Sequence, residues 1–462
     1  MKHKMKTKKL LFSLTILLSF FLMIACKSEV KKEEKSCCSE KVQKHVEWSK
    51  NSNIYEVNIR QYTPEGTLNA FADHLPRLKK MGVDILWLMP IQPIGEKNRK
   101  GTLGSYYAVK DYKAVNPEFG TLEDFKNLVK KVHDLDMHII LDWVANHSAW
   151  DHPWIESNPE WYLKDSTGNI ISPVADWSDV AGFTYENQEL RKAMIDALEY
   201  WVVETNIDGY RCDVAGMVPT EFWEDATSAL MKHKHVFMLA EANVPEHHNY
   251  AFDMSYAWDM HFILNEIVTG EKTLEDIDNK LLKDLEEYPS DAYRMNFTSN
   301  HDENSWKGNA VKRLGPAKEV MAVFTLTASG MPLIYSGQEA CLDKDLEFFE
   351  KDQIEWKECD ITELYTKLLH LKKENKALWN GDFGGKMEKI VTSDDASIYA
   401  YSRIKDGQQV VSILNMSDKE IEFELNDFKT TYTLYEVFNG DQFEQNDKFT
   451  LDPWEFLVYA TK

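Results

Sequence analysis

Residues 121–143 read TLEDFKNLVKKVHDLDMHIILDW, and this stretch contains a helix pattern followed directly by a strand pattern. Thr121 and Asp124 have the spacing of a capping box, which marks the start of a helix. Residues 137–143, MHIILDW, form a short apolar run of strand length. The stretch therefore predicts one helix–strand unit. In its helical part, apolar residues recur at three- and four-residue spacing: Leu122, Phe125, Val129, Val132 and Leu135.

The same alternation continues along the chain from residue 53, and helical spacing recurs in residues 67–81 and 187–205. Strands that alternate with helices form parallel sheets. Eight such units favour an α/β fold, the closed (β/α)8 TIM barrel. A doubly wound open sheet is the alternative, but no GxGxxG motif follows the first strand. The eight candidate strands are IYEVNIR (54–60), VDILWLMP (83–90), MHIILDW (137–143), IDGYRCDV (207–214), VFMLAEA (236–242), FDMSYAW (252–258), YRMNFTS (293–299) and PLIYSGQE (332–339).

Two segments depart from this alternation. Residues 143–186 are irregular and rich in Trp and Pro, and they interrupt the third unit. Near the C-terminus the helical period is lost, and SIYAYSR and QVVSILNM alternate in a way that is typical of antiparallel strands. We therefore expect a barrel over 51–382 that contains the insertion 143–186 and a last helix near 361–379. A β domain is expected over 383–462.

The first 50 residues are predicted to lie outside the barrel. Met1–Lys9 carries five lysines, and residues 10–25 form an apolar run. This run is short for a membrane span and typical of a signal peptide. The sequence MIAC resembles a bacterial lipobox, which would make 1–25 the signal peptide and Cys26 the lipidated residue. Residues 26–50 are charged and are predicted to be a disordered tether, so we expect a lipid-anchored protein of the bacterial cell envelope.

Composition argues against one class of partner. The chain has 53 Lys and Arg against 76 Asp and Glu, a formal net charge of -23. Because such a chain repels phosphate backbones, nucleic acid is not an expected partner. No CxxC pair is present, which argues against a zinc site, and Cys212 and Cys341 are expected to be buried thiols without a disulfide framework. Four histidines are expected at the surface: His233, His235, His247 and His248.

Polar residues gather where the predicted strands end, which is where barrel enzymes carry their chemistry. In glycoside hydrolysis one carboxylate attacks the anomeric carbon and a second protonates the leaving oxygen. Arg211 and Asp213 lie on the same strand face, so Arg211 is expected to keep Asp213 ionised as the nucleophile. Glu241 has no cation beside it in sequence, so apolar surroundings would raise its pKa and make it the acid, then the base. The polar residues at strand ends are Asp142, Asn146, His147, Arg211, Asp213, Glu241, Asn300, His301, Asp302 and Glu339.

Four motifs resemble the conserved regions of the α-amylase family, glycoside hydrolase family 13: DWVANH (142–147), GYRCDVA (209–215), AEAN (240–243) and FTSNHDE (297–303). The resemblance covers about residues 53–462 and implies a small B domain after the third strand and a C-terminal β-sandwich. It implies that Asp213 is the nucleophile, Glu241 the acid/base and Asp302 the carboxylate that grips the distorted sugar. It also implies a sugar subsite lined by Tyr107, His147, Arg211 and His301.

The chain departs from this family in two places. VAGMVP follows Asp213 where many α-amylases have Lys-His, and WSDVAGFTYEN (177–187) replaces the family's fifth motif, so the bond preference stays open. Asn146 matches a calcium ligand of many members, but no partner ligands are identifiable in 143–186. The resemblance therefore implies that the reaction itself requires no cofactor, and that calcium is the one metal ion the protein could bind.

The leading hypothesis is a retaining hydrolase that cuts α-1,4 bonds of starch or maltodextrins. A transglycosylase or isomerase of the same family would use the same glycosyl-enzyme, so the sequence leaves that alternative open. A non-catalytic glucan-binding protein is the third hypothesis, and the presence of all three carboxylates argues against it. In each case the expected partner is an α-glucan, and the membrane is reached through the lipid anchor alone.

Overall fold

The computed structural model describes residues 45–444 and 448–462. The predicted signal peptide, Cys26 and residues 26–44 of the predicted tether lie outside this part of the chain and stay predictions. Within the described residues, no helix is both long enough and apolar enough to cross a membrane.

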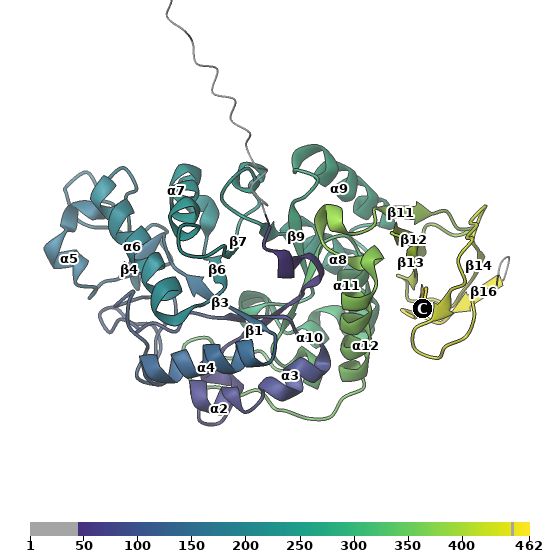
Figure 1. The fold of residues 1–462 in the computed structure, drawn as a ribbon, viewed down its shortest axis with the longest axis horizontal. Helices are drawn as coiled ribbons and strands as arrows, with labels where there is room; N and C mark the ends of the chain where they lie inside the picture. Colours follow the sequence, from purple (N-terminus) through teal and green to yellow (C-terminus); the bar gives the residue numbers. More distant parts are fainter. Residues whose placement is uncertain (1–44, 445–447) are drawn as a thin grey trace, which may run out of the picture. The chain divides into compact units, whose positions relative to one another are not determined.

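Eight parallel strands close into a barrel in the order β1-β10-β9-β8-β7-β6-β3-β2. Figure 1 labels β1, β3, β6, β7 and β9 of this barrel. Each strand overlaps one of the eight apolar runs, so the predicted (β/α)8 barrel is confirmed. Helices cover the outside of parallel strands, which explains why most of their residues are apolar and buried. The strands are β1 (Ile54–Val57), β2 (Ile85–Leu88), β3 (His138–Trp143), β6 (Gly209–Cys212), β7 (Phe237–Ala240), β8 (Met254–Tyr256), β9 (Tyr293–Phe297) and β10 (Met331–Tyr335).

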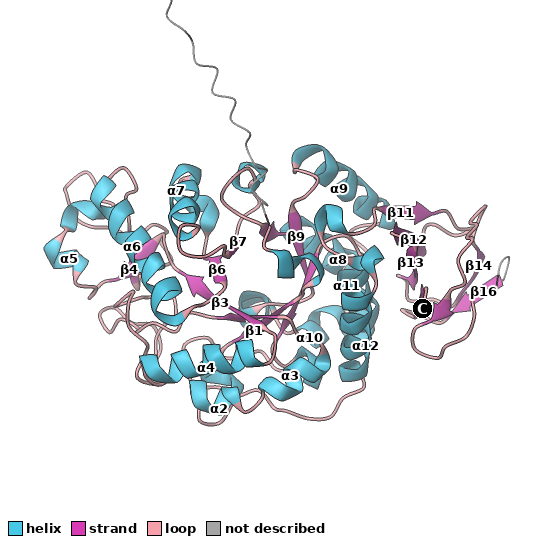
Figure 2. Ribbon diagram, viewed as in Figure 1, coloured by secondary structure: helices cyan, strands magenta, loops and turns pink. Residues whose placement is uncertain are grey.

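Helices surround these strands (Figure 2). The longer helices are α4 (Leu122–Asp134), α6 (Gln188–Thr205), α7 (Thr220–Leu230), α8 (Trp258–Thr269), α9 (Leu274–Glu287), α11 (Lys318–Thr327) and α12 (Ile361–Glu374). The shorter helices are α1 (Ile59–Tyr62), α2 (Leu68–Ala72), α3 (Leu75–Met81), α5 (Trp154–Ser157) and α10 (Ala310–Leu314).

Local sequence determines where the helices begin. At the predicted capping box of α4, Asp124 N donates to Thr121 Oγ1 at 3.2 Å and Thr121 N donates to Asp124 Oδ2 at 2.8 Å. The predicted helical stretch 67–81 is divided into α2 and α3. Pro76 lies in the first turn of α3, where its missing N–H removes no helical hydrogen bond and its fixed φ favours a new helix start.

Residues 45–50 are folded, which corrects the predicted extent of the tether. A 3-10 helix spans Glu47–Asn51, and both His45 and Val46 are buried. Val46 and Trp48 pack against apolar residues of the barrel strands. The prediction failed because two apolar side chains among charged neighbours give too weak a signal for a folded segment.

The insertion and the C-terminal region form their own sheets. Within 143–186, β4 (His147–Ala149) pairs antiparallel with β5 (Val180–Gly182). The C-terminal region has two antiparallel sheets that share one apolar core, which confirms the predicted β domain. Its strands are β11 (Met387–Ile390), β12 (Ile398–Lys405), β13 (Gln408–Asn415), β14 (Ile421–Glu424), β15 (Tyr435–Glu436), β16 (Lys448–Leu451) and β17 (Phe456–Ala460).

One prediction about the cysteines is confirmed and one is wrong. Cys212 is a buried free thiol, as predicted. Cys341 instead forms a disulfide with Cys359. The segment between β10 and α12 returns close to its starting point and brings the two Cα atoms within 6.1 Å. No short sequence motif predicts that a loop will return in this way.

Two of the four histidines expected at the surface are buried, so that prediction is wrong for them. His247 Nδ1 lies 3.1 Å from Thr220 Oγ1, and His248 Nε2 lies 2.7 Å from Ser255 Oγ. Each imidazole thus has one ring nitrogen beside a polar side chain inside the fold, which reduces the cost of burying it.

Candidate active site

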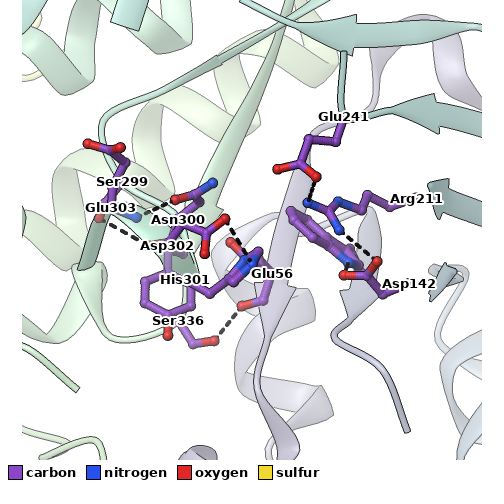
Figure 3. A network of polar contacts seen from close by, with 12 residues as sticks. Glu56, Asp142, Arg211, Glu241, Ser299, Asn300, His301, Asp302, Glu303 and Ser336 are labelled. Atoms are coloured by element: carbon purple, nitrogen blue, oxygen red, sulfur yellow. Dashed lines mark hydrogen bonds and ion pairs between the residues drawn. The ribbon is translucent and has the colours of Figure 1, made fainter. Parts of the chain in front are cut away.

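The carboxyl ends of the barrel strands carry a buried polar cluster (Figure 3). Arg211 on β6 lies at its centre and is fully buried. Asp142 belongs to β3, Asp213 directly follows β6, and Glu241 directly follows β7. The segment 300–303 after β9 contributes the other half of the cluster. The barrel therefore brings most of the predicted site residues to one place.

Arg211 contacts three carboxyl groups. Its Nη1 lies 2.8 Å from Asp142 Oδ1 and 3.1 Å from Asp213 Oδ1. Its Nη2 forms an ion pair with Glu241 Oε2 at 2.9 Å. The prediction that Arg211 distinguishes Asp213 from Glu241 is therefore wrong. Both carboxyl groups meet the same guanidinium, and only one of its three partners is a neighbour in sequence.

Burial dominates the protonation of these carboxyl groups. It raises the pKa of Asp213 well above its usual range, the charge of Glu241 raises it further, and Arg211 opposes both. Burial also raises the pKa of Glu241, again against Arg211. Arg211 lowers the pKa of Asp213, as predicted, but burial and the charge of Glu241 act against it. Two crowded carboxyl groups with raised pKa values can hold one proton between them, an arrangement suited to acid–base chemistry.

The backbone that follows Asp213 adopts an unusual conformation. Val214 has φ 37° and ψ 45°, in the left-handed region that β-branched residues rarely enter. Its N–H donates to Glu241 Oε2 at 2.7 Å. Strained residues of this kind cluster at functional sites, where surrounding contacts hold them. This turn links the ends of β6 and β7.

His301 and Tyr107 connect the remaining parts of the cluster. Tyr107 OH lies 2.8 Å from His301 Nε2 and donates to Asp142 Oδ2 at 3.0 Å. Asp302 Oδ2 lies 3.4 Å from His301 Nε2, and 38% of the Asp302 side chain is exposed. The side chains of Asp213 and Glu241 are 10% and 11% exposed. Asp302 is therefore the most open of these three carboxylates.

Two other predicted residues lie beside Tyr107, and one lies elsewhere. His147 hydrogen-bonds the Tyr107 backbone, yet burial lowers the pKa of His147 to about 3 and keeps it neutral. Asn146 Nδ2 is 3.2 Å from His147 Nδ1. Glu339 does not join the cluster, because its Oε1 pairs instead with Arg77 Nη1 at 3.0 Å and accepts from Tyr55 OH.

The residues around Asn146 do not fit a calcium site. The Asn146 backbone carbonyl accepts from Phe183 N at 3.0 Å, and its side-chain Nδ2 lies 3.2 Å from His147 Nδ1. Calcium takes about six to eight oxygen ligands, but the described chain shows no group of three or more His, Cys, Asp or Glu placed to hold a metal ion. Lys100 Nζ instead contacts the insertion, at 2.6 Å from Asp176 O and 3.2 Å from Asp179 Oδ1.

Two acidic residues make contacts in the cluster that the sequence did not predict. Asp142 was expected at a strand end, but not as a partner of Arg211, Tyr107 and the Trp87 indole, whose Nε1 donates at 3.1 Å. Glu56 on β1 was not expected in the site at all. It is fully buried, and its Oε1 lies 2.5 Å from His301 Nδ1. The available signal was a single Glu inside the apolar strand IYEV, since a buried acid needs a partner.

Two family models match the chain. The model described as α-amylase, catalytic domain, matches residues 45–169 and 161–377. The model described as maltogenic amylase, C-terminal domain, matches residues 389–458. Together they cover both the barrel and the C-terminal sheets.

Named proteins that are similar to the chain include α-amylases. The maltogenic α-amylase AmyB of Thermotoga neapolitana is 32% identical, with a TM-score of 0.81 over 89% of this chain and 98% of that one. Alpha-amylase 3 of Dictyoglomus thermophilum is 26% identical, with 89% of this chain and 93% of that protein covered. The α-amylase MalA of Haloarcula japonica is 26% identical over 80% of this chain, which spans 56% of that relative.

Proposed function

Because the chain belongs to the α-amylase family of glycoside hydrolases, we propose that it hydrolyses α-1,4-glucosidic bonds of starch or maltodextrins and retains the anomeric configuration. One observation carries this proposal: Asp213 and Glu241 bind the same guanidinium at the mouth of the barrel. Retaining enzymes hold their two carboxyl groups about 5–5.5 Å apart, and inverting enzymes hold them about 6.5–9.5 Å apart. A shared guanidinium suits the shorter separation.

The proposed reaction has two steps. In the first, the Asp213 carboxylate bonds to the anomeric carbon while the proton of Glu241 passes to the leaving oxygen. In the second, ionised Glu241 takes a proton from water, and the water oxygen displaces Asp213. Burial raises the pKa values of both Glu241 and Asp213, so the acid role of Glu241 rests on the match of AEAN (240–243) to the family's motif. Arg211 stabilises whichever carboxyl group is ionised at each stage.

The neighbouring residues would bind the sugar ring. Asp302 is open enough to accept hydrogen bonds from sugar hydroxyls and to hold a distorted ring. Tyr107 stacks on His301 with ring centroids 5.4 Å apart, so the pair forms a rigid wall beside Asp302. In this proposal, His147 and His301 supply further hydrogen bonds at the same subsite.

Product chromatography tests the reaction. Starch, maltotriose, pullulan, trehalose and sucrose would be incubated with the wild type and with Asp213→Asn, which should remove nearly all turnover. Shorter maltodextrins alone would support hydrolysis of α-1,4 bonds. Products longer than the substrate, or isomerised disaccharides, would show transfer by a sugar hydroxyl from the same intermediate. Binding of glucan without any product would show a non-catalytic protein.

We further propose that the protein is attached to the bacterial cell envelope through a lipid on Cys26. The lysine-rich start, the apolar run and the MIAC sequence support this location. The wild type should partition with membranes after cell fractionation, and Cys26→Ala should release it. Soluble wild-type protein would contradict the proposal.

A further inference from the structure

Glu56 is an acid inside the barrel with no access to solvent. It is 0% exposed and lies on β1, between apolar neighbours. Its Oε1 is 2.5 Å from His301 Nδ1, and its Oε2 has no hydrogen-bond partner among residues 45–444 and 448–462. A buried acid without good partners is costly, so the contact with His301 is the one that explains its place.

The hydrogen bonds around His301 indicate where its protons are. Tyr107 has a single hydroxyl proton, which it donates to Asp142 Oδ2 at 3.0 Å. The contact between Tyr107 OH and His301 Nε2, at 2.8 Å, then requires Nε2 to be the donor. On the other edge of the ring, Nδ1 lies 2.5 Å from Glu56 Oε1, where an ionised Glu56 accepts a hydrogen bond from Nδ1. A ring that donates from both nitrogens is an imidazolium.

We propose that Glu56 is a positioning residue that keeps His301 doubly protonated, with Nε2–H directed toward Tyr107 and the sugar bound beside Asp302. This inference rests on the proposed function only for the identity of that sugar. If Nε2 lost its proton, it would become an acceptor and could no longer donate to Tyr107 or to a sugar hydroxyl.

The electrostatics of the site agree with this geometry. Burial lowers the pKa of His301, but the charges of Asp302 and Glu56 and the hydrogen bond to Glu56 together raise it to about 9. Burial raises the pKa of Glu56, and His301 and Arg211 oppose that rise. The titratable and charged groups that face this pair are Tyr107, Asp142 on β3, Arg211 on β6, Glu241 after β7, Tyr256 on β8, Asp302 after β9 and Tyr335 on β10.

The test is Glu56→Gln, which keeps the shape and an acceptor oxygen but removes the charge. Nitrogen NMR of histidine-labelled full-length protein would follow the titration of His301, assigned by the signal lost in His301→Asn. Loss of a nearby opposite charge shifts a pKa by about one to three units, so the His301 titration should move down by that amount. The alkaline limb of kcat/KM for maltotriose should move down with it, so the ratio of variant to wild-type kcat/KM should fall as pH rises through the shifted His301 titration.

Glu339→Gln is the matched control. Glu339 is also a fully buried acid next to a barrel strand, but its partners are Arg77 and Tyr55. It should leave the His301 titration and the alkaline limb unchanged.

A neutral His301 in the wild type at neutral pH would overturn the proposal, because Glu56 would then be the protonated partner. An unchanged titration in Glu56→Gln would overturn it as well. If Glu56→Gln does not fold, the wild-type spectrum alone still decides the charge of His301. These NMR results do not depend on activity, so they remain decisive even if glucan hydrolysis is absent.

Discussion

Replacing Arg211 with glutamine removes the guanidinium that binds Asp142, Asp213 and Glu241. Arg211 is 0% exposed, so water cannot replace it without a change in structure. Breaking a buried ion pair by removing one partner costs about 3–5 kcal/mol. We therefore expect Arg211→Gln to lower the free energy of unfolding by about that amount at neutral pH, and to abolish activity.

The stability that Arg211→Gln loses relative to the wild type should increase with pH. Burial already places the folded-state pKa values of Asp213 and Glu241 above their unfolded values of about 4, and loss of Arg211, which opposes that rise, would move them higher still. Such acids stabilise the fold below pH 4 or so, and that stabilisation is lost as pH rises through the folded-state pKa. The difference between the wild type and Arg211→Gln should therefore be smaller at about pH 5 than at about pH 7.5.

Urea denaturation followed by tryptophan fluorescence at both pH values measures this difference. Arg403→Gln is a matched control, because Arg403 is also buried but donates only to backbone carbonyls, among them Gly385 O at 2.9 Å. Its loss should be similar at both pH values. A deficit for Arg211→Gln below about 1 kcal/mol, the level of a surface pair, or one that does not grow with pH, would show that Arg211 does not stabilise the buried carboxylates.

Further outcomes follow from the same contacts. Glu241→Gln should slow maltodextrin hydrolysis by about 10²–10⁴-fold but affect an α-glucosyl fluoride less, since fluoride leaves without a proton; equal losses would contradict its role as the acid. Asp302→Asn should impair both substrates in initial-rate assays, because both require the distorted ring. Chelators should change the melting temperature little, whereas Lys100→Ala should lower it, because Lys100 Nζ contacts Asp179 Oδ1 at 3.2 Å; complete inactivation by chelator, reversed by calcium, would contradict this. Cys341→Ser should lower the free energy of unfolding in urea by about 2–4 kcal/mol, and a wild type insensitive to reductant would argue against the disulfide.

The barrel could be predicted from sequence because its signals are local and repeated. Buried parallel strands give short apolar runs, and the helices between them give three- and four-residue spacing. The capping box at Thr121 is a contact between residues three apart, so it could be predicted from the sequence. The convergence of Asp213 and Glu241 at one end of the barrel could be predicted because each follows a strand, and the strand ends of a barrel converge.

What could not be predicted depends on partners that are distant in the chain. Arg211 and Asp213 are two residues apart, but Glu241 reaches the same guanidinium from the next strand. Glu56 meets His301 across the closure of the barrel. Cys341 and Cys359 meet because a loop returns on itself. Such contacts are set by the closed topology, which residue types alone do not reveal.

If Asp213 forms a glycosyl-enzyme, the configuration at the anomeric carbon is retained. Proton NMR of a maltodextrin digest, recorded before mutarotation, measures that configuration. We expect the first product to carry the α configuration and Asp213→Asn to give no product signal. A first product in the β configuration would rule out a retaining mechanism, and an Asp213→Asn enzyme that hydrolyses maltodextrin at nearly the wild-type rate would rule out Asp213 as the nucleophile.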